Sequence, residues 1–365
     1  MKVLIADYKE SMMPKHDLER QVLTAGLANC EIEVYEYTEK RRAEFLAKLA
    51  QVDALLTAFI PLDRAALAQA GQLKVIAINA TGYDNIDLAA AEEFGIGVCP
   101  VGEYCTQDVA EFTITTMLAL VRQLKAYVTD VDQNHAWRYD LMTPNSRLSN
   151  QTLGIVGLGK IGRAVATRAH ALGMRVLATD PFISDADFAK VSAFVELVSP
   201  ATLFSEADVV TNHMNLNSTN YDYFDAAAFA QMQKHPYFIN MGRGAEVVEA
   251  ALVAALDQGQ LKGAALDVLT TENPDLAHHP LVGRPNVLIT PHVAFYSTDS
   301  LVDLQRISCQ NIVHYLNGEP ENVFKLVTKY YQVSAAVGDK TSRCFFDGKK
   351  RLNRVAGLMV ANYVV

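Results

Sequence analysis

The chain has 365 residues, of which half are hydrophobic and a fifth are charged. This length allows two domains of ordinary size, each with its own core. The net charge of −9 argues against general affinity for nucleic acid. No apolar run approaches the length of a membrane span, and the first residues, 1–7, are typical of a strand rather than a signal peptide.

Cysteine usage indicates a reducing compartment. Five cysteines are scattered along the chain without a CxxC pair, namely Cys30, Cys99, Cys105, Cys309 and Cys344. An odd number of dispersed thiols favours the cytoplasm and argues against a disulfide framework or a zinc site. The adjacent His278 and His279 are expected to be exposed loop residues, because neighbours that face opposite ways suit one metal ion poorly. No metal is predicted.

Short apolar runs alternate with helical patterns nearly throughout, which is typical of parallel α/β units. Five strands are predicted in the first part of the chain, at 3–6, 31–35, 54–57, 75–79 and 97–99. Six more follow, at 153–156, 176–179, 209–212, 237–240, 264–268 and 287–290. The predicted fold class is therefore α/β, with two doubly wound parallel sheets.

Two longer helical patterns bear on the domain organisation. One runs from Asp108 to Tyr127 without proline or glycine and is predicted to be a single helix that links the domains. The other, 299–316, ends at a helix-termination signal, Asn317-Gly318-Glu-Pro320. Periodicity alone does not show which domain this last helix packs against.

The most informative stretch is Gly157-Leu-Gly159-Lys-Ile-Gly162, which lies between a predicted strand and a predicted helix. Gly157 allows a tight turn, Gly159 lets a pyrophosphate approach the backbone, and Gly162 permits close packing of helix on strand. The helix N-terminus favours an anion. Asp180 ends the next strand, where it can reach a ribose diol and repel a 2′-phosphate. This arrangement predicts NAD rather than NADP.

Once NAD is accepted, reduction of a carbonyl needs a proton donor and a group that holds and polarises the substrate. Open α/β sheets place such groups at the carboxyl ends of their strands. Arg243, Glu272 and His292 each follow one of the last three predicted strands. An arginine can bind a carboxylate through two hydrogen bonds, a histidine donates protons near neutral pH, and a carboxylate beside it stabilises the imidazolium.

These residues lie in motifs through which the chain resembles the D-isomer-specific 2-hydroxyacid dehydrogenases, and most of all their D-lactate dehydrogenase branch. The resemblance covers roughly residues 1–323. Its motifs are 157–162 with Asp180, then 240–244, 267–272 and 290–296, together with the loop 80–87 of the first domain. The chain departs from the family at Asn212-His213-Met214-Asn215, where Leu-His-x-Pro is usual, and His213 is expected to pack in that loop rather than to catalyse.

The resemblance implies a role for each matched residue. Arg243 binds the substrate carboxylate and carbonyl, His292 is the general acid and base, and Glu272 tunes His292. The implied substrate-binding residues are Thr81, Gly82, Tyr104 and Phe295. The implied cofactor-binding residues are Gly157, Gly159, Lys160, Ile161, Gly162, Asp180, Met214, Asn215, Asn220, Met241, Gly242 and Asp267.

The resemblance also implies a domain layout and an assembly. A flavodoxin-like substrate domain comprises 1–101 and 296–330, and a Rossmann NAD domain, 102–295, is inserted into it. The molecule is expected to be a homodimer that binds a small 2-oxo or 2-hydroxy acid. The basic extension, 331–365, exceeds the family pattern and is expected to dock on the acidic body or to bind a partner or an anion.

Pyruvate and D-lactate are the leading substrate pair, because Phe295-Tyr296 after the histidine is similar to the lactate branch. Glyoxylate, hydroxypyruvate and bulkier 2-oxo acids are alternatives within the same chemistry. An alternative of another class is an NAD-sensing module for protein–protein contact.

Overall fold

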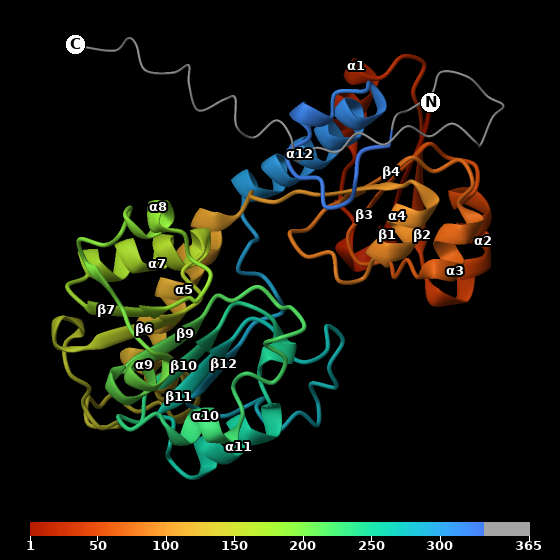
Figure 1. Cartoon of the computed structure of the whole chain (residues 1–365). Coiled ribbons are helices and arrows are strands. Elements are labelled where there is room, and N and C mark those ends of the chain that lie inside the picture. The colour runs from red at the N-terminus through yellow and green to blue at the C-terminus, as the bar shows by residue number, and fades with distance from the viewer. Residues whose placement is uncertain (332–365) are drawn as a thin grey trace, which may run out of the picture. The chain divides into compact units, whose positions relative to one another are not determined.

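The computed structural model of the chain describes residues 1–331. It divides into two compact units, shown in Figure 1. Unit 1 contains Met1–Tyr104 and the described residues from Thr298 onward, and unit 2 contains Cys105–Ser297. The predicted basic extension, Tyr331 apart, lies outside the described residues.

Unit 1 is built on a five-stranded parallel sheet in the order β2-β1-β3-β4-β5. Its strands are β1 (Lys2–Tyr8), β2 (Glu31–Tyr37), β3 (Ala54–Thr57), β4 (Val75–Ile78) and β5 (Gly97–Pro100). The central strands are buried along their length, as expected where helices cover both faces of a parallel sheet. This strand order is that of flavodoxin-like folds, so the predicted fold class is confirmed for this unit.

Helices cover the two faces of this sheet, and each face has its own core (Figure 1). On one face lie α2 (Arg42–Leu49), α3 (Arg64–Gln69) and α4 (Leu88–Phe94). On the other lie α1 (Asp17–Gly26) and α12 (Thr298–Leu316), whose Ile312 and Tyr315 are fully buried. The chain therefore returns to unit 1 after passing through unit 2.

Unit 2 holds a seven-stranded parallel sheet in the order β12-β11-β10-β9-β6-β7-β8. Its strands are β6 (Thr152–Val156), β7 (Arg175–Thr179), β8 (Val195–Leu197), β9 (Val209–Asn212), β10 (Tyr237–Asn240), β11 (Gly263–Leu266) and β12 (Val287–Ile289). The order reverses between β6 and β9, which is the switch point where Rossmann folds bind dinucleotides. The edge strand β8 is missing from the prediction because it has three residues, two of them exposed.

The helices of unit 2 form two layers around this sheet. On one face lie α5 (Thr106–Val121) and α7 (Lys160–Ala171). The other face carries α9 (Pro200–Glu206), α10 (Ala226–Ala230) and α11 (Glu249–Asp257), which share a core with the sheet. The short α8 (Asp185–Phe188) lies between β7 and β8 in the chain.

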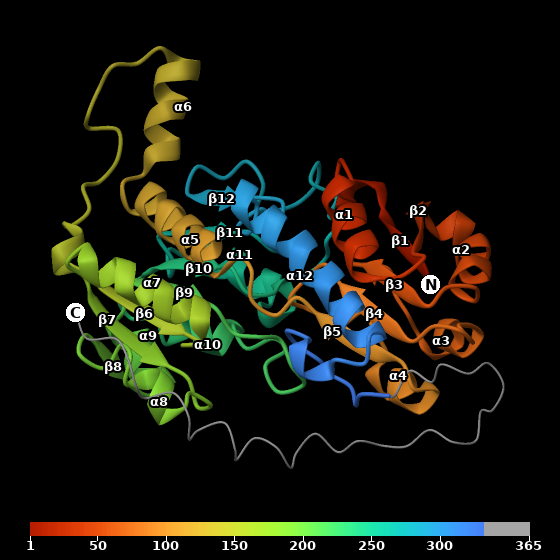
Figure 2. The same cartoon turned by 90° about the horizontal axis from the view of Figure 1, so that it is seen from above.

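The predicted single helix 108–127 is wrong, because the structure breaks it at Gln123. This residue adopts a left-handed conformation with φ of 54°, and a separate helix, α6 (Leu124–Asn134), begins after it. The Gln123 side chain donates to the carbonyl oxygen of Thr143 at 2.8 Å, and Lys125 donates to the carbonyl oxygens of Arg284 and Val287. Figure 2 shows α6 extending away from the sheet of unit 2.

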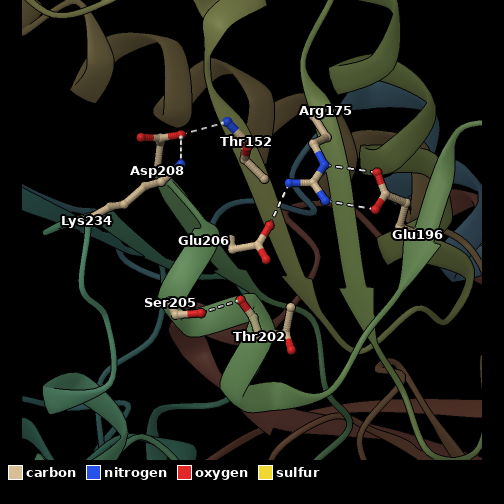
Figure 3. Close-up of polar contacts among 8 residues, drawn as sticks. All are labelled: Thr152, Arg175, Glu196, Thr202, Ser205, Glu206, Asp208 and Lys234. Carbon is tan, nitrogen blue, oxygen red and sulfur yellow. Dashed lines mark hydrogen bonds and ion pairs between the residues drawn. The ribbon is translucent and has the colours of Figure 1, made fainter.

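Polar contacts at the amino ends of the strands of unit 2 tie the sheet together (Figure 3). The Asp208 carboxylate accepts hydrogen bonds from the Thr152 amide at 2.9 Å and from Lys234 at 3.3 Å. Arg175 pairs with both Glu196 and Glu206, but these side chains are about half exposed, so the pairs add little stability. This edge is structural, and it is opposite the edge that carries the predicted site.

Three other features bear on the sequence predictions. Cys30, Cys99, Cys105 and Cys309 carry thiols, with no disulfide among residues 1–331. Within the same residues, none of the helices has the length and apolar character that crossing a bilayer requires. The expectation for His279 is wrong, since its side chain is only 11% exposed and its Nε2 lies 3.3 Å from Glu249.

Candidate active site

The glycine turn joins β6 to α7 at the switch point of unit 2. Gly157 has a φ of 91°, and a Cβ there would lie 2.8 Å from the backbone of His213 and Met214. A Cβ at Gly162 would clash with the carbonyl oxygen of Gly157, so the helix packs against the turn as predicted. At Gly159 the Cβ position is open space, which leaves room for a ligand beside the first turn of α7. The turn therefore fits a pyrophosphate.

Asp180 follows β7 and turns its carboxylate toward the glycine turn. One oxygen accepts from the Leu158 amide at 2.8 Å and the other from the Phe182 amide at 2.9 Å. The side chain is partly exposed, so the carboxylate remains accessible beside the turn. Lys160 and Ile161 are the first residues of α7, which begins on the other side of the same turn. These cofactor positions are thus grouped at the carboxyl ends of β6 and β7.

The three predicted catalytic residues follow three neighbouring strands. Arg243 lies after β10, Glu272 in the loop after β11, and His292 in the loop after β12. Nδ1 of His292 lies 3.1 Å from both carboxylate oxygens of Glu272. That hydrogen bond lowers the pKa of Glu272, with further lowering from the positive charges of His292 and Arg243. The structure therefore brings the imidazole into contact with the carboxylate, and the charge of Arg243 acts on that carboxylate.

Asp267, at the end of β11, organises the loop that carries His292. Its buried carboxylate accepts from the Thr290 hydroxyl at 2.6 Å and from the amides of Val293 and Ala294 at 2.9 Å each. Burial raises the pKa of Asp267, and these hydrogen bonds oppose that shift. Three protein groups donate to its two oxygens, and the cofactor contact of Asp267 stays a prediction.

His292 has a left-handed backbone with φ of 53°, which is costly for a residue with a Cβ. Its amide donates to the carbonyl oxygens of Asp267 at 2.8 Å and Thr290 at 3.0 Å. These bonds and the Asp267 carboxylate hold the conformation and aim the ring at Glu272. The Phe295 ring lies edge-on to the imidazole, with centroids 6.1 Å apart.

The loop after β9 carries the predicted cofactor residues Met214, Asn215 and Asn220. Met214 and Asn215 lie at its partly exposed start, whereas Asn220 is buried. The Asn220 amide donates to the Asn215 carbonyl oxygen and to Glu246, both at 3.1 Å, so this side chain is engaged by the protein itself. Met241 and Gly242 form the buried turn between β10 and Arg243.

His213 in this loop is neutral near physiological pH, because burial lowers its pKa to about 3. Its Nε2 lies 3.0 Å from the Thr211 hydroxyl, and its Nδ1 has no hydrogen-bond partner among residues 1–331. A neutral, half-buried ring is consistent with packing rather than proton transfer.

The predicted substrate residues of unit 1 lie at the carboxyl ends of its strands. Thr81 and Gly82 follow β4, and the Thr81 hydroxyl donates to the Gly102 carbonyl oxygen at 3.4 Å. Tyr104 lies in the loop after β5. Asn85 donates to the carbonyl oxygens of Ala58 and Ile60, which fixes the loop against its neighbour.

The sequence prediction missed one group of site residues, centred on Glu246. This carboxylate is fully buried and accepts a hydrogen bond from the Arg243 amide at 3.0 Å. The spacing of three residues is that of a capping box, in which a glutamate reaches back to the first amide of a helical turn. That signal was available, but it is weaker than a glycine motif.

Comparison with known proteins bears on this site. The sequence profile of the D-isomer specific 2-hydroxyacid dehydrogenase, NAD binding domain, matches residues 114–294. The chain is 33% identical to the glycerate dehydrogenase of Methylorubrum extorquens, over 77% of this chain and 88% of that protein. It is 31% identical to the hydroxypyruvate reductase of Blautia hydrogenotrophica, over 77% of this chain and 87% of that protein. The crystal structure of D-lactate dehydrogenase from Aquifex aeolicus, complexed with NAD and lactic acid, aligns with a TM-score of 0.77 and 26% identity, over 89% of this chain and 98% of that one.

We expect Asp267→Ala to destabilise the protein, since it leaves one hydroxyl and two amides without their acceptor. Buried groups left unsatisfied cost about 1–3 kcal/mol, so the free energy of unfolding should fall by at least ~2 kcal/mol. Urea denaturation measures this change. Asp275→Ala is the matched control, because within residues 1–331 the side-chain partner of that exposed carboxylate is His278, and its loss should cost less than ~0.5 kcal/mol. Equal stability of the two variants would contradict the assignment.

Proposed function

The chain belongs to the D-isomer-specific 2-hydroxyacid dehydrogenase family, and we propose that it reduces pyruvate to D-lactate with NADH. Its cofactor is NAD and its reaction class is hydride transfer between that cofactor and a 2-hydroxy or 2-oxo acid. The observation that carries the proposal is the contact of His292 with Glu272 at 3.1 Å. The positive charge of Arg243 also lowers the pKa of this glutamate.

The residues around the glycine turn fit the cofactor. The open position at Gly159 and the N-terminus of α7 would hold the pyrophosphate, and Asp180 would hold the adenine ribose. A carboxylate at this position would repel the 2′-phosphate of NADPH. NADH, when bound, supplies the hydride that goes to C2 of the 2-oxo acid.

The remaining steps belong to the side chains of the chain itself. The Arg243 guanidinium binds the substrate carboxylate and polarises the carbonyl, and the backbone of Thr81 and Gly82 also holds the carboxylate. Because Nδ1 of His292 faces Glu272, its Nε2 delivers the proton to the carbonyl oxygen. Glu272 stabilises the imidazolium before transfer. His292 is left neutral and regains a proton from solvent.

The surroundings of His292 support a substrate with an apolar third carbon. The Phe295 ring lies beside the imidazole, and an aromatic wall accommodates the methyl group of pyruvate. It offers the hydroxyl of hydroxypyruvate no hydrogen bond, which costs binding energy. In this proposal Tyr104 also contacts the substrate.

Reduction of hydroxypyruvate to D-glycerate is the second candidate. It is supported by the glycerate dehydrogenase and the hydroxypyruvate reductase, which are 33% and 31% identical to this chain. Glyoxylate and bulkier 2-oxo acids remain alternatives of the same class. An NAD-sensing module would bind NADH without turning over any of these acids.

A steady-state panel of 2-oxo acids with NADH tests the proposal. We expect the highest kcat/KM for pyruvate, a product that is D-lactate, and a smaller value for hydroxypyruvate. His292→Ala should lower the rate by a factor on the order of 10²–10⁴, since it removes the general acid, while NADH binding measured by fluorescence stays nearly unchanged. Undiminished turnover in His292→Ala would remove this residue from the mechanism. Tight NADH binding without turnover of any acid would favour the sensor.

We also propose that the protein is a homodimer that works in the cytoplasm. The thiols of the described cysteines support the compartment. The dimer is supported by α6 and the loop after it, which extend from unit 2 (Figure 2) and expose an unusual set of large apolar side chains. They are Leu124, Val128, Val131, Trp137 and Tyr139.

Trp137 gives this proposal a direct readout, because it is the only tryptophan and is 93% exposed in the single chain. If a second copy covers α6, dilution from micromolar to nanomolar concentration should shift tryptophan emission to longer wavelength as the sedimentation coefficient falls. Val131→Asp should produce the monomer at higher concentration. Leu197→Asp is the control, because Leu197 is similarly exposed but lies on β8. Identical emission and a monomeric mass at all concentrations would refute the dimer.

A further inference from the structure

A buried carboxylate lies behind the turn that carries Arg243. Glu246 is 0% exposed, and three N–H groups donate to it. Its Oε2 accepts from the Asn212 side chain at 2.6 Å and from the Arg243 amide at 3.0 Å, and its Oε1 accepts from Asn220 at 3.1 Å. A carboxylate with only donors around it is matched to its ionised form.

The donors come from two segments that are distant in sequence. Asn212 is the last residue of β9 and Asn220 lies in the loop that follows it, whereas Arg243 follows β10. Asn240 completes the network through its side chain. Its Oδ1 accepts hydrogen bonds from the Asn212 side chain and from the Gly242 backbone amide, each at 3.0 Å. Its Nδ2 donates to the Arg243 carbonyl oxygen, also at 3.0 Å. The backbone of Arg243 is therefore held at both its amide and its carbonyl group.

The turn is packed tightly onto this network. A Cβ at Gly242 would lie 2.6 Å from the Oε2 atom of Glu246 and 2.8 Å from the Asn212 amide nitrogen. The lack of a side chain at Gly242 therefore leaves the space that the Glu246 carboxylate occupies. The Arg243 guanidinium also donates to the Gly242 carbonyl oxygen at 3.0 Å, so the side chain is bonded to the turn that this network holds.

Burial of Glu246 has an electrostatic cost that must be offset. Burial raises the pKa of Glu246, while the hydrogen bonds from Asn212 and Arg243, the positive charge of Arg243 and the hydrogen bond from Asn220 oppose the shift. An apolar side chain of similar size would avoid this cost. The chain instead keeps the Glu246 carboxylate and supplies it with three hydrogen-bond donors. This network surrounds the turn that carries Arg243.

We propose that Glu246 is a positioning residue that fixes the Arg243 turn for recognition of the substrate carboxylate. This inference rests on the proposed function of Arg243. A bidentate bond between guanidinium and carboxylate requires a defined orientation, and a loose turn spreads the guanidinium over many orientations. Loss of the anchor should therefore weaken substrate binding more than it slows the chemical step, because His292 and Glu272 do not contact Glu246.

Kinetics of the full-length enzyme with pyruvate test the proposal. Glu246→Leu should raise KM about tenfold, equivalent to ~1.4 kcal/mol, with kcat changed by less than about threefold. Glu246→Gln can keep an acceptor toward Arg243 and Asn212 and lose only the bond from Asn220, so its KM should stay within about threefold of the native value. Asn212→Ala should reproduce the rise in KM if Glu246→Leu does not fold.

Asp208→Ala is the control for general loss of stability. Asp208 also accepts hydrogen bonds from a backbone amide and a side chain in unit 2, but at the opposite edge of the sheet (Figure 3). It should lower the unfolding temperature without moving KM. The proposal is overturned if Glu246→Leu and Asn212→Ala lower the unfolding temperature and leave KM unchanged, or if Asp208→Ala gives the same rise in KM.

Arg243→Ala separates this inference from the function on which it rests. A large loss of kcat/KM in Arg243→Ala, with native KM in folded Glu246→Leu, would reject the role of Glu246 alone. Native KM in Arg243→Ala would reject substrate binding by Arg243, and the inference about Glu246 with it.

Discussion

The hydrogen bonds that the buried Asp267 carboxylate accepts are the interaction on which the site depends. They hold the loop after β12 and thereby the left-handed backbone of His292. A conformation of this kind costs free energy and persists only where the surroundings determine it. In this chain that constraint places the imidazole against Glu272, at 3.1 Å. The strain and the proposed chemistry thus reside in the same residue.

The parallel sheet supplies the rest of the geometry. Because β10, β11 and β12 are neighbours and run in the same direction, the loops at their carboxyl ends meet at one edge. Each loop contributes one predicted functional group, and the Arg243 turn and the His292 loop are each held by a buried carboxylate. Asp267 serves the His292 loop, and Glu246 serves the Arg243 turn. In the proposed mechanism, Asp267 thus holds the proton donor and Glu246 holds the group that binds the substrate carboxylate.

Much of this could be predicted from sequence, because the signals are local. The glycine turn at 157–162 and the eleven predicted strands follow from residue type and spacing, and the structure contains them. The strand β8 and the break at Gln123 could not be found in this way. β8 is too short for a pattern, and Gln123 adopts its left-handed conformation through contacts with Thr143, 20 residues away in the chain.

Local patterns give little warning of the anchors of the site, since the capping-box spacing of Glu246 is a weak signal and most of its partners are distant in sequence. The cofactor role of Asp267 stays a prediction, whereas its anchoring role depends on residues more than 20 positions later in the chain. Glu246 depends on Asn212 and Asn220, 34 and 26 positions earlier. Candidate functional side chains such as Arg243 and His292 can be predicted from residue type and from their position after a strand. Most hydrogen-bond partners of the carboxylates that anchor them can be identified only once the fold is known.

The most direct measurement is a double-mutant cycle on kcat/KM for pyruvate with Glu272→Gln and His292→Ala. If Glu272 acts only through the imidazole it contacts, then Glu272→Gln slows the native enzyme but has no further effect once His292 is alanine. Multiplicative losses from the two substitutions would show that they act independently, and would contradict the central claim.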